Sequence, residues 1–200
     1  MLSKNRQQRI EEIPLNKNTL KEEKYEHITH PFPPLYDADS KILILGSLPS
    51  VKSREQMFFY GHPQNRFWKV ISAVLQEETP TTIEEKRKML LAHHVALWDT
   101  IYSCDIIGSS DSSIKNVVPT DLRTVVEQSK IQHIYCNGRT SGKYFEKYQQ
   151  KTLGMMAEVL PSTSPANAAF GHGSVPCRTS VRYRGQGSLP ELLRWLPYFS

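Results

Sequence analysis

The chain has 200 residues, of which 38% are hydrophobic and 22% charged, and its formal net charge is +5. These values are ordinary for a soluble globular protein and fit one domain with a sizeable core, with or without tails. The mild positive charge is compatible with a nucleic-acid partner without requiring one. No stretch approaches the roughly twenty apolar residues that a membrane helix needs, which excludes a spanning segment of that kind.

The three cysteines, Cys104, Cys136 and Cys177, lie far apart in the sequence. They form no CxxC pair and match no zinc or iron–sulfur spacing, so the cysteine pattern predicts no metal site. An odd number of cysteines without a secretory signal favours a reducing compartment, and we expect a cytoplasmic protein.

The two ends of the chain differ in composition from its middle. Residues 1–35 are highly charged and end in a proline cluster, which predicts a peripheral helical arm or disordered tail followed by an extended lead-in. Residues 36–170 carry the pattern of a folded domain. Residues 171–200 are rich in glycine and basic, with four arginines against one glutamate, and we treat them as a separate C-terminal segment.

Strand-like and helix-like patterns alternate through the middle of the chain. Four β-rich, mostly apolar runs are predicted as strands at 42–46, 94–99, 131–137 and 157–160. Helical spacing of apolar residues lies between them at 65–75, 83–93 and 122–128. This alternation predicts an α/β fold with a parallel sheet covered on both faces.

Ligands in such folds bind beyond the carboxyl ends of the strands, and each predicted strand here ends in polar residues. Ser47 follows the first strand, Asp99 ends the second and Asn137 ends the third, while 161–167 follow the fourth. Asp99 is a general base, an orienting group or simply a carboxylate with its hydrogen bonds satisfied. Asn137 is equally typical of an amide that binds a nucleobase and of a turn residue. We therefore predict the functional site at this edge of the sheet.

The segment 58–68 combines aromatic rings with polar side chains just before a predicted helix. Tyr60, with Phe59 as second choice, offers a ring that can stack on a nucleobase, a contact worth about 1–3 kcal/mol. Asn65 offers a donor and an acceptor, so it can orient a water molecule or read a base edge. Its alternative role is the N-cap of the helix, which residue type alone favours.

Taken together, these segments resemble the uracil-DNA glycosylase superfamily. The segment 61–71 resembles the mismatch-specific uracil-DNA glycosylases, and the wider set resembles the hypoxanthine (deoxyinosine) DNA glycosylase branch more closely. That set consists of Gly46-Ser47-Leu48-Pro49, His62-Pro63-Gln64-Asn65 with Phe67-Trp68, Ala96-Leu97-Trp98-Asp99, Gly108-Ser109-Ser110-Asp111-Ser112, Asn137-Gly138 and Leu160-Pro161-Ser162-Thr163-Ser164-Pro165-Ala166-Asn167. The resemblance implies a three-layer α/β/α sandwich around a short, mostly parallel four-stranded sheet.

The resemblance also implies a DNA-repair enzyme that flips out a deaminated base, hypoxanthine in deoxyinosine, and hydrolyses its glycosidic bond to leave an abasic site. The implied catalytic residue is Asn65, and the implied base-binding residues are Ser47, Tyr60 and Asn137. The implied DNA-contacting residues are Ser162, Ser164 and Asn167. We expect no metal or organic cofactor, a monomer, DNA as the partner, and association with the nucleoid if the source is bacterial.

One departure from the mismatch-specific pattern bears on the chemistry. Those enzymes carry an asparagine that handles the attacking water in their first motif, whereas this chain has Leu48 there. The deoxyinosine branch resembles this chain in lacking that asparagine, and Asn65 in the adjacent loop is the candidate for the role. Leu48 and the unusual Gly- and Arg-rich end leave two alternatives: a uracil glycosylase acting on G·U mismatches, and a DNA-binding relative whose catalysis has lapsed.

Overall fold

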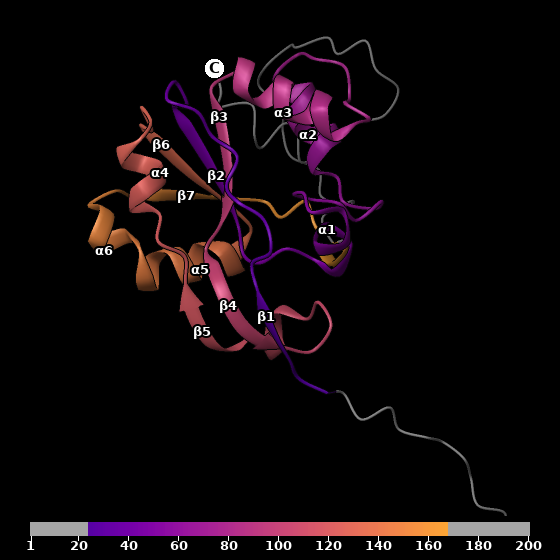
Figure 1. The fold of residues 1–200 in the computed structure, drawn as a ribbon, viewed down its shortest axis with the longest axis vertical. Helices are drawn as coiled ribbons and strands as arrows, with labels where there is room; N and C mark the ends of the chain where they lie inside the picture. Colours follow the sequence, from indigo (N-terminus) through magenta and orange to yellow (C-terminus); the bar gives the residue numbers. More distant parts are fainter. Residues whose placement is uncertain (1–23, 168–200) are drawn as a thin grey trace, which may run out of the picture.

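A four-stranded parallel sheet forms the centre of the computed structural model, which describes residues 24–167 (Figure 1). Its strand order is β3-β2-β6-β7, with β2 at Ile42–Gly46, β3 at Val95–Asp99, β6 at His133–Asn137 and β7 at Ala157–Leu160. These are the four strands that the apolar runs predict. The parallel sheet of the expected fold is therefore confirmed, with strand ends within two residues of the predicted ones.

Helices cover both faces of this sheet. Figure 1 shows α1 (Val51–Gln56), α2 (Phe67–Val74) and α3 (Ile83–Ala92) on one side. On the other side lie α4 (Arg123–Glu127), α5 (Arg139–Tyr148) and α6 (Gln150–Leu153). This division follows from right-handed crossovers, because the chain steps from β2 outward to β3 and then back across β2 to β6 and β7. The three-layer α/β/α arrangement is therefore confirmed.

Local sequence explains where two of the helices form. In α2, Phe67, Val70, Ile71 and Val74 recur at helical spacing, and all four are buried against the sheet. The helix α3 starts with a capping box in which the Thr82 hydroxyl accepts from the Glu85 amide while the Glu85 carboxylate accepts from the Thr82 amide. Hydrogen bonds from the Thr82 and Thr81 backbones hold the pKa of Glu85 at about 2.

A second sheet, which we did not predict, extends the molecule below the first. It is antiparallel with the order β1-β4-β5, formed by Glu26–Thr29, Ile101–Ile106 and Lys115–Pro119, and a short 3₁₀ turn, η1 (Asp111–Ser113), precedes β5. Only Thr100 separates β3 from β4, so the chain leaves the parallel sheet and enters the antiparallel one almost without a break. The predicted strand ends at residue 99, and the residues beyond it that form β4, among them Tyr102 and Ser103, do not continue its apolar run. Helices α1, α5 and α6 were also not predicted.

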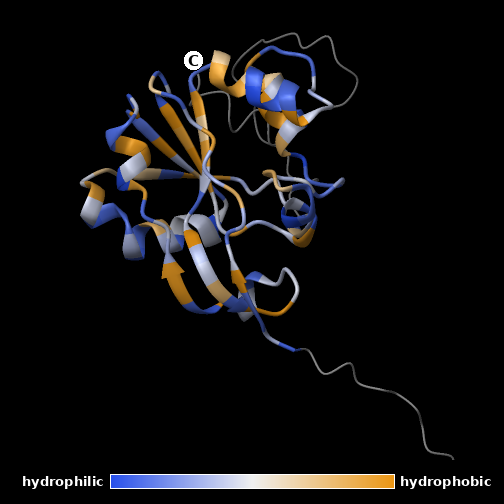
Figure 2. Ribbon diagram, viewed as in Figure 1, coloured by the Kyte–Doolittle hydropathy of each residue, from blue (hydrophilic) through white to orange (hydrophobic). Residues whose placement is uncertain are grey.

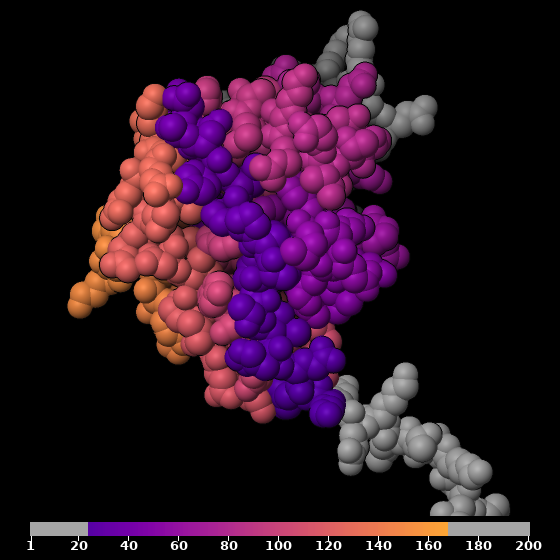
Figure 3. All heavy atoms as spheres, viewed as in Figure 1, coloured from indigo at the N-terminus to yellow at the C-terminus, as the bar shows by residue number. Residues whose placement is uncertain are grey.

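Residues 26–35, expected to be the end of a peripheral arm and an extended lead-in, are part of the fold. They supply the strand β1, and Phe32 and Leu35 are buried in the main hydrophobic core. The amide of Leu35 donates to the carbonyl of Leu97 at 3.0 Å, and the amide of Leu97 donates back at 2.8 Å. Figure 3 shows the segment (indigo) running down one face between the two halves of the molecule. The predicted arm at 1–23 and the segment at 171–200 lie outside the described residues.

The hydrophobic core lies where the strands meet the helices. Figure 2 shows apolar residues concentrated on the central strands and polar residues on the outward faces of the helices. Leu43, Ile44, Leu45 and Leu97 on the strands are fully buried, as is Phe145 on α5 apart from 1% of its surface. Within residues 24–167, no helix is long and apolar enough to cross a membrane.

The burial of Leu35 predicts that the segment before residue 36 stabilises the whole domain. Leu35→Ala should lower the free energy of unfolding by about 2–5 kcal/mol, because it leaves a cavity in the core. The measurement is a urea denaturation curve, with Met156→Ala as the control because the Met156 side chain is 75% exposed. A loss below about 1 kcal/mol, no larger than an average substitution, would mean that the segment is peripheral to the fold.

Candidate active site

A cavity of about 670 Å³ opens at the carboxyl edge of the parallel sheet, as the strand pattern predicts. The ends of β2, β3, β6 and β7 form its floor, and the loops after β2, α1, β4 and β7 form its walls. All seven residues singled out from the sequence line it: Ser47, Tyr60, Asn65, Asn137, Ser162, Ser164 and Asn167. The cavity is within the range of about 300–1,000 Å³ that is typical of small-molecule sites.

Thr163 joins the two predicted asparagines behind the cavity wall. Its backbone amide donates to Oδ1 of Asn137 at 3.0 Å, and Nδ2 of Asn137 donates to its hydroxyl at 2.9 Å. The hydroxyl then donates to Oδ1 of Asn65 at 2.9 Å. Because a backbone amide can only donate, the orientation of the Asn137 amide is fixed, and so is the direction of the whole chain of hydrogen bonds.

Asn65 has its acceptor occupied and its donors available. Its Oδ1 accepts from the Thr163 hydroxyl and also from the amide of Phe67, the first residue of α2, at 2.9 Å. The side chain therefore serves the start of the helix, as residue type suggests, and lines the cavity at the same time. Since both lone pairs of Oδ1 are used, Asn65 meets a ligand through the two hydrogens of its amide nitrogen.

Tyr60 packs its ring in the wall and brings an unpaired hydroxyl to the floor. The ring is stacked on Phe67 with centroids 3.8 Å apart and planes at 16°. The hydroxyl is buried and makes no hydrogen bond of ordinary geometry among the described residues, and the Asn137 side chain lies close enough to lower its pKa slightly. Burial, and secondarily the negative charge of Asp99, raises the pKa of this hydroxyl far above its usual range. It is therefore a neutral donor, and an unpaired buried donor favours a polar ligand. Phe59, the second choice for stacking, also reaches the cavity but is 97% buried among Phe32, Phe58 and Trp98.

The loop 161–167 is held rigid by its own hydrogen bonds. The Ser162 hydroxyl accepts from the Ser164 amide at 3.2 Å, and Nδ2 of Asn167 donates to the Ser162 carbonyl at 3.0 Å. Nη2 of Arg66 donates to the carbonyls of Ser162 and Ser164 at 3.4 and 3.3 Å. At Gly138, whose φ is +105°, any side chain would press on Ser162. The loop is thus anchored to the ends of β6 and α2, and its serine hydroxyls keep their hydrogens for donation.

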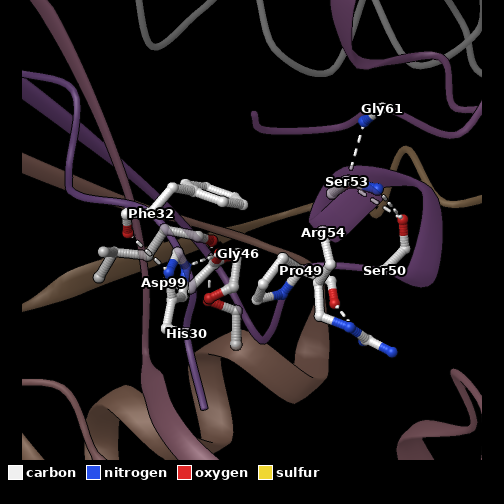
Figure 4. Close-up of polar contacts among 11 residues, drawn as sticks. His30, Phe32, Gly46, Pro49, Ser50, Ser53, Arg54, Gly61 and Asp99 are labelled. Carbon is white, nitrogen blue, oxygen red and sulfur yellow. Dashed lines mark hydrogen bonds and ion pairs between the residues drawn. The ribbon is translucent and has the colours of Figure 1, made fainter. Parts of the chain in front are cut away.

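Sequence reasoning missed several residues that the structure brings to the site. Thr163 lay in the predicted loop but was not distinguished from its neighbouring hydroxyls. Arg54 and Arg139 place cationic groups at the cavity, and Arg54 is oriented by donation from Nη1 to the Pro49 carbonyl at 3.0 Å. His30 contacts Asp99 from the segment that follows β1. Figure 4 shows Arg54 and the Ser50–Ser53–Gly61 hydrogen bonds that fix the loop around α1.

The fold and the site define an α/β protein whose sheet edge presents amide, hydroxyl and guanidinium donors around a cavity of about 670 Å³. The model of the uracil DNA glycosylase superfamily matches residues 33–181, and the chain belongs to that family. A hypoxanthine DNA glycosylase of Methanosarcina acetivorans is 36% identical over 141 residues, which are 70% of this chain and 88% of the relative. The hypoxanthine DNA glycosylase of Methanosarcina barkeri is 30% identical over 138 residues, 68% of this chain and 86% of the relative.

A solved structure supports the same assignment. It is a solution NMR structure of a protein from Methanosarcina acetivorans, described as a candidate uracil DNA glycosylase. The two chains are 35% identical, the TM-score is 0.62, and the match covers 70% of this chain and 88% of the other. The predicted family is confirmed, and the roles of the individual site residues remain predictions.

The position of Thr163 predicts that its hydroxyl stabilises the site. Thr163→Val keeps the shape of the side chain but leaves Nδ2 of Asn137 and Oδ1 of Asn65 each with one hydrogen bond fewer. The free energy of unfolding should fall by about 1–3 kcal/mol, measured by chemical denaturation. Thr163→Ser retains the hydroxyl and should lose less than half as much, and an equal loss in the two variants would assign the effect to packing instead.

Proposed function

We propose that this protein excises hypoxanthine from deoxyinosine in DNA and leaves an abasic site, as a monofunctional DNA glycosylase. The observation that carries the proposal is the chain of hydrogen bonds through Thr163, which fixes the amides of Asn65 and Asn137 at one cavity. The two curated relatives named hypoxanthine DNA glycosylase support this base over others.

The cavity suits a base that has left the DNA stack. A base in a duplex is unreachable, so the enzyme must flip it out at a cost of a few kcal/mol, which is lower for a mispaired or damaged base. Within the cavity, Nδ2 of Asn65, the second hydrogen on Nδ2 of Asn137 and the Tyr60 hydroxyl are donors. Ser47 adds a hydroxyl at the end of β2. Hypoxanthine offers the acceptors O6, N3 and N7 to such donors.

Bond cleavage is assisted by stabilising the departing base. The C1′–N9 bond of deoxyinosine breaks toward an oxocarbenium-like sugar, and its electron pair leaves with the base. Donors that are already oriented stabilise the resulting negative charge without reorganisation, which is the largest contribution in many enzymes. Asn65 and Asn137 are oriented in this way by their shared contact with Thr163.

The DNA backbone would be gripped at the rim of the same cavity. Ser162, Ser164 and Asn167 lie in the anchored loop after β7, where hydroxyls and backbone amides suit phosphate oxygens. Arg54 and Arg139 add positive charge, which strengthens the contact and makes it sensitive to salt. We expect a monomer that acts on DNA in the cytoplasm.

Leu48 has a packing role where the mismatch-specific enzymes have their water-binding asparagine. Its side chain lines the cavity and packs on the core of the antiparallel sheet, formed by Ile101, Cys104 and Ile106. The apolar side chain at position 48 therefore contributes to packing between the cavity wall and the antiparallel sheet. Water activation then depends on other groups in the cavity.

The proposal predicts alkali-labile cleavage at deoxyinosine in a labelled duplex, with Asn65→Ala and Asn137→Ala each losing about 10²–10³-fold in the rate of excision. Rates are measured under single-turnover conditions with enzyme in excess. Gln132→Ala is the control, because that side chain is exposed away from the cavity and should leave the rate unchanged.

Three results would redirect the proposal or its assignment of residues. Cleavage only at deoxyuridine would identify uracil as the substrate. No cleavage of either duplex by a folded protein that binds DNA in a salt-dependent manner would identify a relative without catalysis. Full activity in both asparagine variants would reject their assignment.

A further inference from the structure

Asp99 reaches the cavity over a residue that has no side chain. It ends β3 and lies in register with Gly46, the last residue of β2, and both line the cavity. A Cβ atom at Gly46 would collide with Oδ1 of Asp99. The carboxylate therefore occupies the space directly above the end of β2, and glycine at position 46 is what makes that space available.

His30 holds the other oxygen of this carboxylate. Nε2 of His30 is 2.8 Å from Oδ2 of Asp99, and Nδ1 is 2.9 Å from the carbonyl of Phe32 (Figure 4). A carbonyl can only accept, so Nδ1 carries a hydrogen and a second proton lies between Nε2 and Oδ2. The His30 side chain is fully buried, with the rings of Phe32 and Trp98 at 4.5 and 4.2 Å. Both ring nitrogens of His30 are thus engaged, and the ring holds Oδ2 of Asp99 in one orientation.

Oδ1 of Asp99 remains as an acceptor that faces the cavity. The described part of the chain gives it no hydrogen-bond partner, and the Tyr60 hydroxyl is its polar neighbour above Gly46. Stability alone is a weak explanation for a buried ion pair, because apolar residues of similar volume often stabilise the folded protein as well or better. An ion pair that leaves one oxygen open to a cavity has a chemical use.

Asn65 cannot supply what Oδ1 of Asp99 supplies. The attacking water must lose a proton, and Oδ1 of Asn65 is not free to take it because it already accepts two hydrogen bonds. Its amide nitrogen can hold the water oxygen but cannot take the proton. Asp111 also lines the cavity, but it is exposed in the turn before β5.

Charge places Asp99 at the sugar end of the cavity. In the sheet, the register puts Asp99, Gly46, Asn137 and Leu160 in one row, so two strand spacings, about 10 Å, separate Asp99 from Asn137. A carboxylate beside the departing base would oppose the negative charge that develops there, whereas beside C1′ it stabilises the positive sugar. Asn137 therefore belongs to the base and Asp99 to the sugar and the water.

We propose that Asp99 is the catalytic proton acceptor of this glycosylase and that His30 is its positioning residue, an inference that rests on the proposed function. As the C1′–N9 bond breaks, the electron pair leaves with the base. The water oxygen bonds to C1′, and one proton of the water passes to Oδ1 of Asp99. That proton then leaves for the released base or the solvent, so the products are the free base and the abasic sugar, and the enzyme is unchanged.

Asp99→Asn tests this with little change of shape. The introduced amide can donate to Nε2 of neutral His30, and its oxygen can occupy the place of Oδ1, so the variant should fold and bind DNA like the wild type. Because an amide accepts no proton from water, single-turnover excision at deoxyinosine should fall about 100-fold or more. Asp105→Asn is the matched control, since Asp105 pairs with His27 at the same 2.8 Å on the antiparallel sheet, away from the cavity. It should retain the wild-type rate.

Two further readouts separate chemistry from structure. In Asp99→Ala, added formate should restore part of the rate by filling the space with a small carboxylate, and it should not affect Asn65→Ala. His30→Gln introduced into the wild type should lower the excision rate by about tenfold or more. Introduced into the Asp99→Asn variant, it should lower the rate no further, as expected for a residue that acts through Asp99.

The outcomes distinguish this inference from the proposed function. Wild-type rates in Asp99→Asn would overturn the role of Asp99 while leaving excision by the protein established. Reduced rates in the Asp99 variants without rescue by formate, together with additive effects of His30→Gln and Asp99→Asn, would mean that His30 and Asp99 have a structural role only. A wild type that cleaves no lesion would contradict the proposed function itself.

Discussion

The register of the parallel sheet is the constraint on which the site depends. Neighbouring strands in a parallel sheet end at the same edge, and the pairing of β2 with β3 and of β6 with β7 aligns their last residues. Asp99 and Asn137, the polar residues that end β3 and β6, are thereby held in one row with the ends of β2 and β7, and neighbouring strand ends lie about 5 Å apart. A shift of a single strand by one residue would turn its terminal side chain to the opposite face and dismantle the row. The apolar bodies of β2 and β3, which are buried almost throughout between the two helical layers, oppose that shift.

The polar groups at this edge divide by hydrogen-bonding capacity. On the side of β6 and β7, the hydrogen bonds through Thr163 occupy the side-chain oxygens of Asn65 and Asn137, so that hydrogens of their amide nitrogens are available to a ligand. On the side of β3, the contact with His30 occupies Oδ2 of Asp99, so that Oδ1 is available as an acceptor. Donors thus face one end of the cavity and an acceptor faces the other, which matches the opposite charges that develop on the two fragments when a glycosidic bond breaks.

Much of this arrangement follows from local sequence. The runs at 42–46 and 157–160 are strands at the same residues in the structure, and the helix expected at 83–93 spans Ile83–Ala92, because apolar patterning and a capping box are local signals. The strand-end rule then placed Ser47, Asn137 and the loop 161–167 at one edge of the sheet. Tyr60 and Asn65, which were singled out by their residue types, line the same cavity. The antiparallel sheet was harder to see, since β1 is almost entirely exposed and β4 mixes polar and apolar residues without a regular alternation.

What the sequence did not reveal was pairing over long distances. His30 and Asp99 are 69 positions apart, and Thr163 and Asn65 are 98 apart. Nothing in the residues around His30 indicates that it turns inward, because a histidine between threonine and proline is typical of a surface segment. Among the hydroxyls of the loop after β7, only tertiary contacts distinguish the one that faces Asn137.

The same long pairings govern when the pocket can exist during synthesis of the protein. The loop that carries Thr163 is among the last of the described residues to leave the ribosome, and until then Asn65 and Asn137 have no bridge between them. His30 is synthesised early, but its contact with Asp99 cannot form until residue 99 has also left the ribosome. Contacts so distant along the chain form late in folding, because the loops between them must close first. A nascent chain should therefore carry no working pocket, so a partly made enzyme has no means of attacking DNA.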